Sequence, residues 1–162
     1  MRRPWRRHAE TPAQVLAIVA AARPRTLILD VEPFVVRWEQ DDDAWQRRAA
    51  EVADAIAGIG GVEALVYASN STRALALPDR ATGPAVRAVP GAGKPWRRRA
   101  YRDLPRPLVV IGDQVLTDGL LAWLLSAPFV QYRPAGRRPW WPSIQHVLGV
   151  PVGVLAFRRV PH

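Results

Sequence analysis

Three short apolar runs alternate with helix-like segments along the chain. The runs are RTLILDV (residues 25–31), VEALVYAS (62–69) and PLVVIG (107–112). Each has the length of a strand and is apolar at consecutive positions, which is typical of parallel strands covered on both faces. Strands that alternate with helices predict an α/β fold, a Rossmann-like three-layer sandwich with a central parallel sheet.

The remaining elements have weaker signals. Thr11 and Pro12 mark the start of an Ala-rich helix, and apolar residues recur at helical spacing from Asp43 to Ile59, where Gly60 and Gly61 stop the pattern. Because proline can only begin a strand, PFVQYR (128–133) is expected to be an edge strand. We also expect short helices over 73–77, 97–104, 117–125 and 143–148, and a short strand at AVRAV (85–89).

A chain of 162 residues is long enough for one domain with a sizeable core. We expect a flexible basic arm over residues 1–10 and the α/β domain over 11–135. Residues 136–162, rich in proline and tryptophan, are expected to form an extension packed on that domain.

The absence of cysteine excludes disulfides, zinc–thiolate sites and a cysteine nucleophile. Any metal would be held mainly by oxygen atoms, which favours Mg²⁺. No apolar run reaches the ~18 residues that a transmembrane helix needs, and the apolar part of the N-terminal segment is short for a signal peptide. We therefore expect a cytoplasmic protein.

The formal net charge of +9 comes almost entirely from arginine. This charge favours anionic partners such as phosphorylated substrates, acidic lipid headgroups or nucleic acid. An Arg-, Ala- and Pro-rich genome would explain the composition equally well. Seven tryptophans accompany the arginines and are compatible with peripheral contact at an anionic membrane. Nucleic acid is a weaker candidate because no groove-reading motif is present.

Polar residues follow each of the three apolar runs. Asp30 and Glu32 end the first, Ser69 and Asn70 the second, and Asp113 the third, with Asp118 five positions later. In a doubly wound sheet, ligands bind beyond the carboxyl ends of the strands. We therefore expect these side chains to meet in one crevice.

An apolar strand ending in Asp-x-acid, a strand ending in Ser, a lone Lys-Pro and the stretch GDQVLTD occur in this order. Together they resemble the four motifs of the haloacid dehalogenase (HAD) superfamily. GKP and GDQVLTD are most similar to subfamily IIIA, the branch that resembles phosphatidylglycerophosphate phosphatases. The resemblance covers roughly residues 12–135 and implies hydrolysis of a phosphomonoester with Mg²⁺.

The resemblance also implies roles for individual residues. Asp30 would be the nucleophile that carries the phosphoryl group. Mg²⁺ would lie between Asp30, the backbone carbonyl of Glu32 and the carboxylate of Asp113. Asp118 would bind the metal through water or orient a ligand. Ser69 and Asn70 would bind the phosphate, and Lys94 would offset the negative charge of Asp30 and the phosphate. Lys94 is the only lysine among 23 basic residues, which is a reason to single it out.

Two positions depart from the family pattern. The first motif reads DVEPF instead of Asp-x-Asp-x-Thr, so Glu32 replaces the general acid and Phe34 replaces a threonine. Two functions remain open: a phosphatase, with slow turnover or a large substrate such as a lipid phosphoester, and an impaired HAD-like protein that binds phosphate or a partner. The segments that follow Asp30 and Ser69 are too short to hold a cap domain. The pocket would therefore be open, or a neighbour in a homo-oligomer would close it.

Overall fold

The computed structural model describes residues 3–35, 42–71, 77, 82–135 and 149–159. The strands are β1 (Trp5–Ala9), β2 (Thr26–Asp30), β3 (Ala64–Ala68), β4 (Ala85–Val89), β5 (Leu108–Gly112), β6 (Phe129–Tyr132) and β7 (Arg158–Arg159). The helices are α1 (Pro12–Ala22), α2 (Asp42–Ala57), α3 (Leu120–Leu124) and a helix over 149–156. Shorter helical turns are η1 (Val31–Val35), η2 (Arg98–Tyr101) and η3 (Val115–Gly119).

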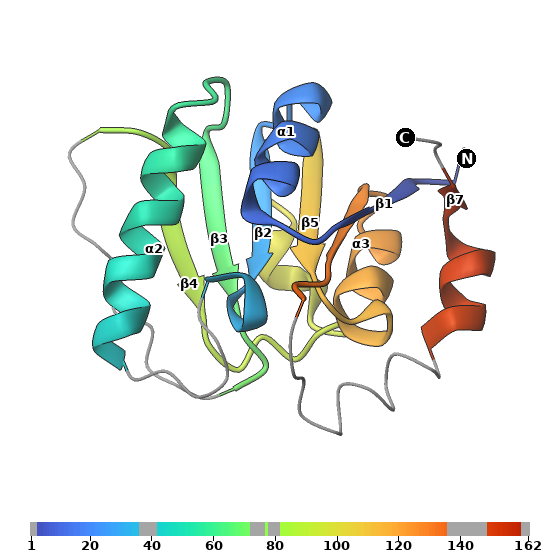
Figure 1. The fold of residues 1–162 in the computed structure, drawn as a ribbon. Helices are drawn as coiled ribbons and strands as arrows, with labels where there is room; N and C mark the ends of the chain where they lie inside the picture. The colour runs from blue at the N-terminus through green and yellow to red at the C-terminus, as the bar shows by residue number, and fades with distance from the viewer. Residues whose placement is uncertain (1–2, 36–41, 72–76, 78–81, 136–148, 160–162) are drawn as a thin grey trace.

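All seven strands form one parallel sheet in the order β4-β3-β2-β5-β6-β1-β7 (Figure 1). The chain passes from β2 outward to β3 and β4 on one side, and β5 returns to pair with β2 on its other side. The strand order therefore reverses beside β2, which is where open α/β sheets place their ligands. The expected α/β sandwich is confirmed.

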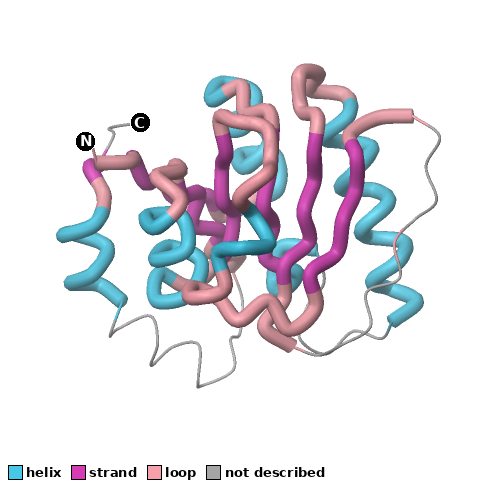
Figure 2. The backbone as a smooth tube through the Cα atoms, turned by 180° about the vertical axis from the view of Figure 1, so that it is seen from behind, coloured by secondary structure: helices cyan, strands magenta, loops and turns pink. Residues whose placement is uncertain are grey.

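Two apolar layers cover the sheet. Leu27 and Leu29 belong to the layer that packs beneath α1 and α2, whereas Ile28, between them in sequence, belongs to the layer with α3 and η2. This alternation follows from the two-residue period of a strand. Because both faces are covered, β2, β3 and β5 are almost wholly buried, as their continuous apolar sequences predict (Figure 2).

Local signals explain the two long helices. The Thr11 hydroxyl caps α1 by accepting the Gln14 backbone N–H, and the Thr11 backbone N–H donates in turn to Gln14 Oε1. In α2, Trp45 and Ala49 begin a row of buried residues, spaced three or four positions apart, that faces the sheet. The predicted helix start at Thr11 and Pro12 is therefore confirmed, and α2 begins at Asp42, one residue before the expected Asp43.

Five expectations need correction or fall outside the described residues. Residues 1–10 are not simply a flexible arm, because Trp5–Ala9 forms β1 and pairs with β6 and β7. For the same reason β6 is an interior strand. The helix expected over 97–104 shrinks to η2, because Arg98–Tyr101 makes only a 3₁₀ turn. The helices expected over 73–77 and 143–148 lie, for nearly all their length, outside the described residues.

The described part of the C-terminal extension contributes the helix over 149–156 and strand β7 at the end of the sheet. None of the described helices combines the length and apolar character that a bilayer-spanning segment needs.

Removal of residues 1–9 should lower the free energy of unfolding by about 2–4 kcal/mol, because β6 and the apolar residues beneath it would lose their neighbour. Chemical denaturation monitored by circular dichroism measures this change. Removal of residues 1–3 alone is the control and should have little effect. Equal stability of the two truncated chains would show that β1 adds nothing to the sheet.

Candidate functional site

The sequence-predicted residues lie at the carboxyl edge of the sheet, on the lower side in Figure 1. Asp30 is the last residue of β2, Ser69 directly follows β3, and Asp113 directly follows β5. These three strands are neighbours in the sheet. The edge therefore gathers the predicted residues around the point where the strand order reverses.

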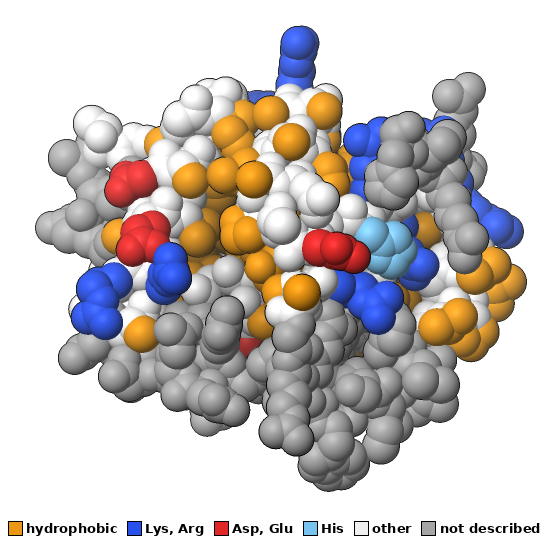
Figure 3. All heavy atoms as spheres, viewed as in Figure 1, with side chains coloured by type: hydrophobic (Ala, Val, Ile, Leu, Met, Phe, Trp, Pro, Cys, Tyr) orange, Lys and Arg blue, Asp and Glu red, His pale blue; other side chains and the backbone are white. Residues whose placement is uncertain are grey.

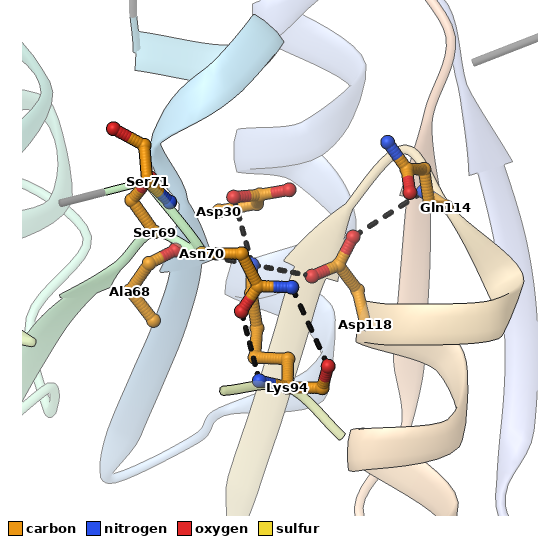
Figure 4. A network of polar contacts seen from close by, with 8 residues as sticks. All are labelled: Asp30, Ala68, Ser69, Asn70, Ser71, Lys94, Gln114 and Asp118. Atoms are coloured by element: carbon orange, nitrogen blue, oxygen red, sulfur yellow. Dashed lines mark hydrogen bonds and ion pairs between the residues drawn. The ribbon is translucent and has the colours of Figure 1, made fainter. Parts of the chain in front are cut away.

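Lys94 lies at the centre of this group, although it comes from the turn after β4 (Figure 4). Its Nζ is 2.8 Å from Asp30 Oδ1 and 2.7 Å from Asp118 Oδ1, and it donates to the Ala68 carbonyl oxygen at 3.1 Å. The Lys94 side chain is only 2% exposed. Three oxygen partners match the three N–H donors of an ammonium, so the buried charge is fully bonded.

The amide of Asn70 holds the backbone of Lys94. Asn70 Oδ1 accepts the Lys94 backbone N–H at 2.8 Å, and Nδ2 donates to the Lys94 carbonyl oxygen at 3.4 Å (Figure 4). Asn70 thus joins the end of β3 to the turn that carries the lysine. Its predicted contact with phosphate stays a prediction.

Ser69 is buried beside this pair, and its Oγ accepts the Ser71 backbone N–H at 3.1 Å. A hydroxyl that accepts a hydrogen bond keeps its own proton for donation. The side chain is therefore held in place while a donor remains for an oxygen atom of a ligand.

The carboxylates of Asp30, Asp113 and Asp118 each offer an oxygen atom within 4.8 Å of the other two. Together with Lys94, three carboxylates leave two excess negative charges, which a divalent cation would neutralise. The donors are all oxygen, the type that hard cations such as Mg²⁺ prefer. The residues present therefore fit a metal ion, and Asp113 joins Asp30 as the sequence predicts.

The electrostatics of the cluster depend on burial and on mutual repulsion. Burial, followed by the charge of Asp118, raises the pKa of Asp30 well above its ordinary value, and Lys94 only partly offsets this. Burial lowers the pKa of Lys94, but the charges of Asp118 and Asp30 outweigh it, so the pKa is raised overall. Lys94 is therefore a permanent cation in this site.

Asp118 packs directly against the backbone of Gly112. A Cβ atom at Gly112 would lie 2.4 Å from the Asp118 Cγ atom, closer than any side chain allows. Asp118 Oδ2 accepts the Gln114 backbone N–H at 3.3 Å while Oδ1 binds Lys94. Both oxygens of Asp118 are thus engaged, and its role in metal binding stays a prediction.

Two buried polar side chains near the site were missed from the sequence. The Nε2 of Gln131, in β6, donates to the Asp113 carbonyl oxygen at 2.8 Å and thereby fixes the backbone of a candidate metal ligand. The only signal was a glutamine within the otherwise apolar stretch FVQY. Tyr101, in η2, is also buried, and burial raises its pKa to about 12.

The two departures from the family pattern lie on η1. Glu32 is half-buried, and its carboxylate is not part of the three-acid cluster found among the described residues. The Phe34 ring packs edge-on against Tyr132 at a centroid distance of 5.0 Å. Phe34 also lines a cavity of roughly 630 Å³ bordered by α1 and α2, where Figure 3 shows hydrophobic side chains gathered.

Comparisons with known proteins find no matching family model, curated protein or solved structure.

Gly112→Ala should lower the free energy of unfolding by about 1–3 kcal/mol and weaken metal binding, because the new Cβ displaces the Asp118 carboxylate. Thermal unfolding with and without Mg²⁺ measures both effects. Gly58→Ala is the matched control, since its Cβ would meet its nearest atom at an ordinary 3.5 Å. A Gly112→Ala variant with unchanged stability and metal response would contradict this account of Asp118.

Proposed function

We propose that this protein is an HAD-type hydrolase of phosphomonoesters that uses Mg²⁺ and an aspartyl-phosphate intermediate on Asp30. The observation that supports the proposal most strongly is the ammonium of Lys94 held between Asp30 and Asp118, with Asp113 beside them. Four residues from three separate stretches of the sequence would supply a nucleophile, a fixed positive charge and the ligands for a cation.

Asp30 is suited to be the nucleophile because it is the most accessible acid of the cluster. Its side chain is 14% exposed, whereas that of Asp118 is 1% exposed. Lys94 holds Oδ1 of Asp30 and so fixes the direction of the second oxygen, Oδ2. Attack of that oxygen on phosphorus forms the new O–P bond as the bond to the leaving alcohol breaks.

Asp30 and Asp113 would hold Mg²⁺, which when bound supplies positive charge between the anionic nucleophile and the anionic phosphate. Since Lys94 already uses its three N–H donors on protein oxygens, its contribution is to neutralise and orient the acids. Ser69 would donate its free hydroxyl proton to a phosphoryl oxygen. Glu32 would protonate the leaving alcohol and then accept a proton from the hydrolytic water.

Asp30→Asn should reduce Mg²⁺-dependent hydrolysis of p-nitrophenyl phosphate by about a thousandfold or more, because the amide cannot form the phosphoryl intermediate. Release of p-nitrophenol measures the rate. Asp103→Asn, an exposed aspartate on another loop, is the control and should keep full activity. Turnover that survives in Asp30→Asn would exclude Asp30 as the nucleophile.

The second candidate is a catalytically impaired protein of the same fold that binds phosphate, another anion or a partner. The sequence of the first motif favours it, because Glu32 replaces the aspartate on which proton transfer depends in the HAD pattern. The nucleophile and the metal-binding residues would then serve binding alone.

Glu32→Asp separates the two candidates. If glutamate is the adapted acid, the shorter side chain withdraws the carboxylate by roughly 1.5 Å and should lower turnover by on the order of a hundredfold. We expect this decrease, measured as kcat with the same substrate. An increase in turnover would instead identify Glu32 as the impairing change and support the second candidate.

A further inference from the structure

A strongly basic surface adjoins the site. It consists of one tryptophan and five arginines, here called the basic rim: Arg87, Trp96, Arg97, Arg98, Arg99 and Arg102. All six are exposed, and Trp96 is 76% exposed. The sequence contains no aspartate or glutamate from residue 85 to residue 102, and Asp103 follows directly, so the segment carries a large excess of positive charge.

The basic rim is attached to the turn that carries Lys94. Trp96 and Arg97 each donate a backbone N–H to the Gly93 carbonyl oxygen, at 2.9 and 3.1 Å. The Arg97 side chain lies across Gly93, because a Cβ there would be 2.7 Å from Arg97 Cδ. Arg87 donates a side-chain hydrogen bond to the Ala100 carbonyl oxygen, which links β4 to η2. The rim is thus held next to the site by specific contacts.

A hollow of roughly 540 Å³ is bordered by Trp96, Arg97, Arg98 and Arg99 together with the residues that follow β4. Arg98 and Arg99 are the first two residues of the 3₁₀ turn η2, so their side chains project about 120° apart, and Arg97 is the N-cap of that turn. Such an arrangement spreads charge over an area and does not trace a line.

This geometry distinguishes between two classes of anionic partner. A single-stranded nucleic acid is bound along a basic track with successive aromatic platforms. The basic rim has a single tryptophan, and Arg98 and Arg99 project in different directions. An anionic bilayer presents charge in every lateral direction, and tryptophan favours the membrane–water interface.

We propose that the basic rim docks the protein on the surface of an anionic lipid bilayer, with Trp96 at the interface and the arginines over the acidic headgroups. This inference does not depend on catalysis. If the proposed phosphatase activity is also present, docking would bring the carboxyl edge of the sheet toward phosphate groups displayed at that surface.

The test is co-sedimentation of the full chain with vesicles of phosphatidylcholine containing roughly one-third phosphatidylserine, compared with pure phosphatidylcholine. The rim variant is Arg97→Gln/Arg98→Gln/Arg99→Gln. Each arginine near such a surface contributes about fivefold to binding, so the variant should bind on the order of a hundredfold more weakly. Trp96→Ala should also weaken binding, and pure phosphatidylcholine should bind little protein.

The charge-matched control is Arg3→Gln/Arg47→Gln/Arg48→Gln, which removes three exposed arginines from the N-terminal segment and from α2 on the opposite face of the sheet. It should bind within about threefold of the unmodified chain at physiological salt, where distant charges are screened. Equal losses in the two variants, undiminished binding of the rim variant, or equal binding to neutral vesicles would overturn the proposal.

Two further measurements separate this inference from other outcomes. Asp30→Asn should bind vesicles as tightly as the unmodified chain, so vesicle binding is tested independently of the phosphatase proposal. The rim variant should hydrolyse soluble p-nitrophenyl phosphate at the unmodified rate. A single-stranded oligonucleotide serves as the competing ligand. If the rim variant loses the oligonucleotide but keeps the vesicles, the surface binds nucleic acid and the membrane assignment is wrong.

Discussion

The buried ammonium of Lys94 is the interaction on which the site depends. A charge removed from water is costly unless it is paired and hydrogen-bonded, and here two carboxylates and one carbonyl oxygen provide three bonds. Those partners come from the ends of β2 and β3 and from η3. One side chain thereby fixes three segments relative to one another, and loss of its charge would leave Asp118 buried without its cation.

The choice of lysine in an arginine-rich chain follows from this geometry. A guanidinium is planar and wide, and its donors form a rigid fork suited to a single carboxylate face. An ammonium is compact and directs three donors to three separate oxygen atoms. Gly112 allows the Asp118 carboxylate to approach, and Asn70 fixes the lysine backbone. The position of the ammonium thus depends on Gly112 and Asn70 as well as on the charged groups.

The sequence predicted those parts of the structure whose signals are local. Continuous apolar runs indicated β2, β3 and β5, and polar residues at their ends indicated the edge where Asp30 and Asp113 meet. Strand β1 could not be predicted from WRRHA, because its partner β6 and not its own pattern makes it a strand. Gln131 was missed for a similar reason, since its importance arises from a contact with Asp113 across the sheet.

The site divides into two parts that are supported by different elements. The nucleophile, Lys94 and the candidate metal ligands are fixed by strand ends and by buried hydrogen bonds, so substitutions there affect both stability and binding. Glu32 and Phe34 lie on η1, where Phe34 packs against Tyr132 at the cavity bordered by α1 and α2. The Phe34 side chain therefore belongs to the apolar layer beneath α1 and α2. This separation is a physical reason why a chain could alter its proton-transfer residue while it keeps the residues suited to hold a cation.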